Sequence, residues 1–105
     1  MKKKIFTTTN EKISSLAFYP EDNLLFVGTR GERIYALNLE NYETLGVFEC
    51  DGRIGHLFAF TRTKRLLVYT AYPPPEYLRL IRWEWASEND KSEIRYKEVK
   101  RIKCH

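Results

Sequence analysis

The sequence predicts an all-β fold built from two units of four antiparallel strands, and three observations support this prediction. The apolar–turn–apolar pattern that begins at Ile13 begins again at Ile54, 41 positions later, and Leu66 follows Leu24 by 42 positions. The apolar segments are short and rich in β-branched and aromatic residues, and turn residues separate them. No segment shows a convincing helical period. A fixed repeat of about 40 residues made of short strands indicates consecutive blades of a propeller.

Turn chemistry separates the strands of the first unit. The strand predicted at residues 13–19 ends in a Pro-Glu-Asp-Asn sequence, whose residue types favour turns. Residues 24–29 are apolar on both faces, which predicts a central strand covered on both sides. The tight Arg-Gly-Glu turn that follows leads into the outer half of the unit, predicted as strands at residues 33–40 and 44–50.

The second unit repeats this order after the break at Asp51 and Gly52. Its strands are predicted at residues 54–60, 66–72, 77–85 and 94–103. Residues 88–98 are polar enough for a helix, but their alternating apolar side chains fit a strand at least as well.

One further strand is predicted at residues 3–8, which is one outer strand more than two units need. It either completes a blade together with another subunit or covers a sheet edge with its lysines. We therefore expect one two-blade unit over residues 1–105, with blade one at about 13–50 and blade two at about 54–103.

Residues 18–40 resemble a WD repeat. They contain an apolar strand that ends in a Pro-Asp-type turn, a small central strand with a glycine, a hairpin and a third strand. The Trp-Asp pair that closes such repeats falls on Leu37 and Asn38 in the first unit, and on Trp83 and Glu84 in the second. The resemblance implies a β-propeller fold.

The Gly-His pair that opens a family repeat is absent, and residues 11–12 and 52–53 occupy that region. The buried Asp–His–Ser/Thr–Trp network of strict members is therefore not implied. The resemblance covers about residues 4–103. It implies a scaffold role, because WD-repeat propellers mainly act as scaffolds within complexes.

Two blades cannot close a ring, and each end blade leaves one apolar face uncovered. Three possibilities remain open: the chain self-assembles into a ring, it is part of a larger protein, or it completes the open ring of a partner. Three copies would supply six blades and four copies eight, and both numbers occur in propellers.

The net charge of +4 is predicted to reside at the two ends of the chain. Residues 1–12 sum to +3 and residues 91–105 to +4, so the residues between them sum to −3. No apolar run is long enough to span a membrane, and the N-terminal Met-Lys-Lys-Lys sequence lacks the apolar region of a secretory signal. Cys50 and Cys104 have no metal-type spacing, which favours reduced thiols in a cytoplasmic protein.

The sequence contains no phosphate-binding loop, no nucleophile elbow and no His-x-x-x-His pair, so we expect no enzyme activity, no cofactor and no metal site. His56 has no carboxylate or nucleophile near it in sequence, which favours a structural or surface imidazole. Cys104 and His105 are interpreted as a chain end rather than as metal ligands. Trp83 and Trp85 alternate along one strand, which favours core packing over a ligand platform.

Three segments are candidates for interaction. One is a proline-stiffened hairpin tip flanked by aromatic rings, one is a basic turn, and one is the basic N-terminus. Their candidate residues are Tyr72, Pro74 and Tyr77; Arg62, Lys64 and Arg65; and Lys2, Lys3 and Lys4.

Three function classes follow from the sequence. The first is a protein-interaction module that completes a propeller with copies of itself or with a larger propeller-containing partner. The second is an RNA- or DNA-associated subunit that binds phosphates through the basic ends. The third and weaker class, a carbohydrate-binding protomer, is suggested only by the tyrosine and tryptophan content.

Overall fold

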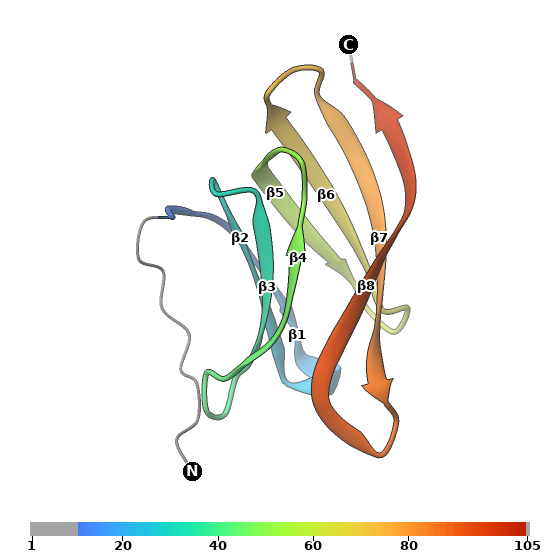
Figure 1. Cartoon of the computed structure of the whole chain (residues 1–105). Helices are drawn as coiled ribbons and strands as arrows, with labels where there is room; N and C mark the ends of the chain where they lie inside the picture. The colour runs from blue at the N-terminus through green and yellow to red at the C-terminus, as the bar shows by residue number, and fades with distance from the viewer. Residues whose placement is uncertain (1–10, 105) are drawn as a thin grey trace.

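The computed structural model describes residues 11–104, which form two four-stranded antiparallel sheets (Figure 1). Sheet one has the order β1-β2-β3-β4 and sheet two the order β5-β6-β7-β8, as the sequence predicts. The strands are β1 (Ile13–Tyr19), β2 (Leu24–Thr29), β3 (Arg33–Asn38), β4 (Thr44–Glu49), β5 (Arg53–Phe60), β6 (Arg65–Tyr72), β7 (Tyr77–Ser87) and β8 (Asp90–Lys103).

All eight strands predicted from residue 13 onward are present. Strand β3 ends at Asn38 rather than at residue 40, and β8 begins at Asp90, so residues 88–98 are not helical. Between residues 11 and 104 the only helical segment is the 3-10 turn η1 (Pro20–Asp22), and no helix there could span a membrane. The strand predicted at residues 3–8 lies outside the described residues.

The two sheets pack face to face. Inner strand β1 contacts inner strand β5, and outer strand β4 contacts outer strand β8. Trp83 is fully buried at this interface, with its ring centroid 5.2 Å from that of Tyr19 and 5.6 Å from that of Phe26. Trp85 is also buried and meets Trp83 edge to face. The prediction that both tryptophans pack in the core is confirmed.

The structural repeat between the two sheets has an offset of 41 residues through the first two strands. The last residue of the first strand pairs with Leu24 in sheet one and with Arg65 in sheet two. Leu24 therefore corresponds to Arg65, and Leu25 corresponds to Leu66. The offset of 42 suggested by matching Leu24 with Leu66 is wrong, and a shift of one residue exchanges the two faces of a strand.

The assignment of the Trp-Asp positions in the second unit is also wrong. Leu25 pairs with Leu37 in sheet one, and Leu66 pairs with Ile81 in sheet two. The counterpart of Leu37 is therefore Ile81, two residues before Trp83. The sequence match placed Trp83 46 residues after Leu37, whereas the offset between β3 and β7 is 44, so the match lengthened the second hairpin too much. It was drawn to Trp83 because β7 continues past the point at which β3 ends.

Matching irregularities confirm that the two sheets are repeats of one design. The register shifts near the start of β1 and again near the start of β5. It shifts a second time between Ala36 and Leu37 in sheet one and between Leu80 and Ile81 in sheet two, which are corresponding positions. Bulges at equivalent places bend both sheets in the same way.

The charge is divided between the sheets rather than confined to the chain ends. Residues 13–50 contain six acidic and two basic side chains, a net charge of −4. Residues 51–104 contain twelve basic and seven acidic side chains, a net charge of +5. The basic C-terminal residues lie in β8, an integral strand of sheet two, so sheet two as a whole is basic and sheet one is acidic.

Candidate functional site

Each sheet turns one face toward the other sheet and one face outward. We call the outward face of sheet one open face one, and the outward face of sheet two open face two. On open face one, Leu16 is 57% and Phe18 58% exposed, and Val47 on β4 is also exposed, whereas Val27 and Leu37 on the same face are buried. Open face one therefore carries exposed apolar side chains on two of its strands, β1 and β4.

Open face two is likewise apolar at its centre. Phe58 is 58% exposed and Ile102 is 51% exposed. Their neighbours on the adjacent strands of this face are also apolar, and these neighbours are half-buried. They are Leu67, Leu78 and Leu80. A row of basic side chains crosses the same face in register with Phe60, so these leucines have a basic border. The row consists of Arg65, Arg82 and Lys97.

Serine side chains join the inner strands of the two sheets. The Ser14 hydroxyl donates to the carbonyl oxygen of Ile54 in β5 and lies 3.2 Å from the carbonyl oxygen of Gly28. The Ser15 hydroxyl accepts a hydrogen bond of 2.9 Å from the amide of Leu57. These bonds fix how β1 lies against β5.

Small residues let the sheets approach closely. A Cβ atom at Gly28 would lie 3.1 Å from the Cβ of Ile54 and would clash with its Cγ2. A Cβ atom at Gly46 would lie 2.7 Å from the carbonyl oxygen of Ile94 and 3.3 Å from the ring of Tyr96. The face of sheet one that meets sheet two therefore has no side chain at two positions, Gly28 and Gly46. Large side chains of sheet two pack against both glycines.

The predicted basic turn joins β5 to β6, and its residues have separate roles. Arg62 and Lys64 adopt positive φ angles of 66° and 53°. The Arg62 amide donates to a carboxylate oxygen of Glu21 at 2.8 Å. The Lys64 ammonium lies 5.8 Å from the Trp83 ring centroid, and Arg65 is exposed in β6.

The predicted proline tip lies at the opposite end of β6, so the structure does not bring the two candidate segments together. Tyr72 and Pro74 are exposed, and the Arg53 guanidinium stacks 4.8 Å from the Tyr72 ring centroid. Tyr77 is half-buried, and its ring lies near two further guanidinium groups. The third candidate segment, Lys2 to Lys4, lies outside the described residues.

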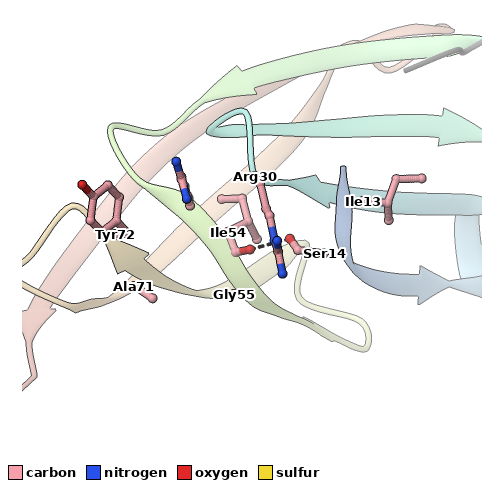
Figure 2. A pocket seen from close by; sticks show the side chains of 8 residues that line it. Ile13, Ser14, Arg30, Ile54, Gly55, Ala71 and Tyr72 are labelled. Carbon is pink, nitrogen blue, oxygen red and sulfur yellow. Dashed lines mark hydrogen bonds between the residues drawn. The ribbon is translucent and has the colours of Figure 1, made fainter. Parts of the chain in front are cut away.

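A pocket of about 380 Å³ lies between the sheets at the end where β1 and β5 begin (Figure 2). Ser14 and Arg30 line it from sheet one, and Arg53 and Tyr72 line it from sheet two. Within residues 11–104 neither arginine forms an ion pair. Sequence reasoning missed both arginines, because they lie 23 positions apart in different blades and only the packing of the sheets brings them together.

A buried guanidinium near this end is another feature that the sequence analysis missed. Arg79 is almost fully buried; its Nη1 lies 2.5 Å from Asp51 and 3.4 Å from Glu98, and its Nε donates to Thr70 at 3.0 Å. A hydrogen bond from Arg79 lowers the pKa of the Asp51 carboxyl. Burial raises the pKa of the nearby Cys50 thiol to about 12. Arg79 and Ile81 are two positions apart in β7, so their side chains lie on the same face of the strand. This spacing was the signal that Arg79 faces inward.

Groups with catalytic or metal-binding potential are sparse. Between residues 11 and 104 no three His, Cys, Asp or Glu side chains are placed to hold a metal ion. His56 is exposed on open face two with its ring 6.1 Å from that of Tyr69, and both cysteines are free thiols.

No protein-family model matches the chain, and no curated protein matches it. Solved structures do match. A chain of the mitotic checkpoint complex superposes with a TM-score of 0.72 at 19% identity over 95% of this chain. BamB from Moraxella catarrhalis gives 0.67 at 12% identity over 94%, and the β-propeller domain of Cps50 (Swd1) from Myceliophteria thermophila gives 0.59 at 8% identity over 83%.

The chain has the fold of a partial β-propeller. Its two sheets correspond to two blades, and the chain spans only 29%, 26% and 25% of the lengths of these three matched chains. The propeller fold implied by the resemblance to WD repeats is confirmed, whereas no family match establishes the WD-repeat family itself.

Proposed function

We propose that this protein is a non-catalytic interaction module that binds further propeller blades through its two open faces. The observation that supports this function is the exposure of Phe18 and Phe58 on opposite outer sheet faces. In a propeller, each blade buries both faces against its neighbours, and a blade at the end of a stack lacks one of them. The bound partner is a protein that presents a blade, either another copy or a larger propeller-containing chain.

The shape of the surface favours a protein partner. Each open face is a sheet surface on which apolar side chains are spread over several strands, whereas a small ligand binds in a concave pocket that surrounds it. Blade-to-blade packing buries such a surface in one step, and the hydrophobic effect then supplies about 25 cal/mol for each Å² of apolar area removed from water.

Photo-crosslinking in cells that produce the protein tests this function. A benzophenone amino acid replaces Phe58 in one variant and Phe18 in another, and the matched control carries it at Tyr42, which is 57% exposed in the β3–β4 turn. We expect covalent protein adducts from positions 58 and 18, and mass spectrometry should identify the attached peptides as propeller strands. Adducts that are no more frequent than those at Tyr42 would contradict the proposal.

A second candidate function is nucleic-acid binding, and the net charge of +5 in residues 51–104 favours it. Fluorescence anisotropy with random-sequence RNA and DNA tests it, because phosphate contacts weaken steeply as salt rises. Arg82→Gln and Lys97→Gln should each reduce both the affinity and the salt slope. Absence of binding at low salt would eliminate this candidate. The carbohydrate candidate has no support, because both tryptophans are buried.

A further inference from the structure

We infer that a second copy of this chain covers the open faces, with open face two of one copy packed head to tail on open face one of the next. This inference rests on the proposed function and names its partner. Repetition of the contact by rotation would close a ring of two-blade subunits. The argument rests on the repeat register, on side-chain size and on charge.

The repeat register makes the open faces counterparts of the faces already packed inside the chain. At the offset of 41, Phe58 on open face two corresponds to Ala17, and Leu67 corresponds to Phe26, and both Ala17 and Phe26 pack against sheet two. On open face one, Leu16 corresponds to Leu57, which packs against sheet one. A head-to-tail contact therefore repeats the packing that joins the two sheets of one chain.

Side chains that are small at the contact inside the chain are replaced by large ones on open face two. Inside the chain, the small Ala17 and Gly28 of sheet one belong to the face that meets the bulky face of sheet two. On open face two the corresponding positions hold the large Phe58 and Tyr69.

Open face one provides the complementary room. Strand β3 ends at Asn38, whose counterpart in sheet two is Arg82. Sheet one therefore has no strand residue at the positions of Trp83 and Trp85, the rings that fill the interface inside the chain. Inside the chain Trp83 meets Tyr19 and Phe26, whose counterparts on open face two are Phe60 and Leu67, so the room on open face one lies opposite Phe60 and Leu67.

Charge also distinguishes a head-to-tail contact from a symmetric one. The β1–β2 turn contains Glu21 and Asp22, and its counterpart, the β5–β6 turn, contains Arg62 and Lys64. Inside the chain these two turns touch, because the Arg62 amide donates to Glu21. The repeated contact would bring the Arg62 turn of one copy to the Glu21 turn of the next. Unlike charges then meet, whereas packing like face on like face would oppose like charges.

The mass of the purified chain is the first test. Light scattering coupled to size-exclusion chromatography should give three or four times the 12.5 kDa mass of one chain. These values correspond to six or eight blades, both within the usual range. A monomer would overturn the inference. A dimer would overturn it if each variant with one blocked face still dimerises alone, because two copies can also close a ring of four blades through head-to-tail contacts.

Two variants with opposite faces blocked test the head-to-tail geometry directly. Phe18→Asp blocks open face one and Phe58→Asp blocks open face two; both side chains are exposed, so neither change creates a core cavity. We expect each variant alone to be a monomer and an equimolar mixture to form a one-to-one complex of twice the chain mass. Self-association of one variant alone, or a mixture that stays monomeric, would overturn the inference.

Controls separate blocked assembly from loss of folding. Tyr42→Asp changes an equally exposed ring outside both faces and should keep the wild-type mass. Leu16→Lys and Ile102→Asp provide a second blocked pair, and far-UV circular dichroism verifies that each variant retains its sheets. The mixture is measured by sedimentation velocity at concentrations up to about tenfold above those at which the wild type assembles, because ring closure adds avidity that a single contact lacks.

A charge exchange tests the turn-to-turn contact. Arg62→Glu and Glu21→Arg should each raise the concentration for half-assembly about tenfold, and the double variant in one chain should return it toward the wild-type value. Glu21→Gln keeps the oxygen that accepts from the Arg62 amide and shows how much of the effect is charge. Two single effects that simply add in the double variant would contradict the proposed contact.

These experiments distinguish failure of the inference from failure of the proposed function. A purified chain that stays monomeric, together with cellular crosslinks from positions 18 and 58 to another propeller chain, overturns self-assembly and leaves the interaction module intact. A monomer without such crosslinks overturns both.

Discussion

Replacing Trp83 by alanine should cost about 4 kcal/mol of unfolding free energy. The side chain is fully buried between the sheets, and its ring meets three other aromatic rings, with centroids between 5.2 and 5.8 Å away. Truncation of a buried tryptophan to alanine costs about 3–5 kcal/mol, because burial is lost and a cavity remains. Since small domains are stable by only about 5–15 kcal/mol, Trp83→Ala should remove a large part of the margin.

A matched variant, Trp83→Phe, separates ring packing from hydrogen bonding. The Trp83 Nε1 is buried without a hydrogen-bond partner among residues 11–104, so phenylalanine keeps an aromatic ring and removes an unsatisfied donor. We expect a loss of about 1 kcal/mol. Urea unfolding at a fixed protein concentration, followed by far-UV circular dichroism, measures both losses. Equal losses for the two variants, or a loss below about 1.5 kcal/mol for Trp83→Ala, would refute the assigned packing.

Three further predictions concern chemistry and close packing. Because burial raises the pKa of the Cys50 thiol to about 12, a chromogenic disulfide should titrate only Cys104 in the folded protein and both thiols in urea; rapid reaction of both would show that Cys50 is accessible. The Arg79 hydrogen bond lowers the pKa of Asp51, so its stabilisation is present above the ordinary value of 3.8 and is lost as the pH falls through the lower folded value. The stability difference between wild type and Asp51→Asn should therefore shrink on acidification below 3.8, and a constant difference would contradict this account. Gly28→Ala should cost about 1–3 kcal/mol by pushing β1 and β2 away from β5, and an unchanged melting temperature would show that the inner strands are less tightly packed.

Local patterns were sufficient to predict the strands. Leu24–Thr29 is apolar on both faces, and five of its six residues are buried. Asn23 adopts the left-handed conformation, with φ of 57°, where the predicted turn requires it. Such features depend on residues close in sequence, so a single sequence reveals them.

Features that depend on register between distant strands could not be predicted in this way. The Trp-Asp alignment allowed for a longer hairpin before β7 but lengthened it by too many residues, because loop length cannot be inferred from the apolar pattern alone. The convergence of Arg30 and Arg53 on one pocket requires knowledge of how the two sheets pack. The basic character of sheet two was missed because residues 91–105 were counted as a chain end, although the strand predicted at residues 94–103 already belonged to the second unit.

The division of charge between the sheets gives the molecule an electric dipole moment that points from the acidic blade to the basic blade. A dipole orients an approaching copy before contact, which raises the rate of productive encounters without changing the contact itself. Dissolved ions shorten the reach of this field to about 8 Å at physiological ionic strength. In the proposed assembly, ionic strength should therefore set how fast two copies meet in the correct orientation, while the apolar faces determine how long they remain together.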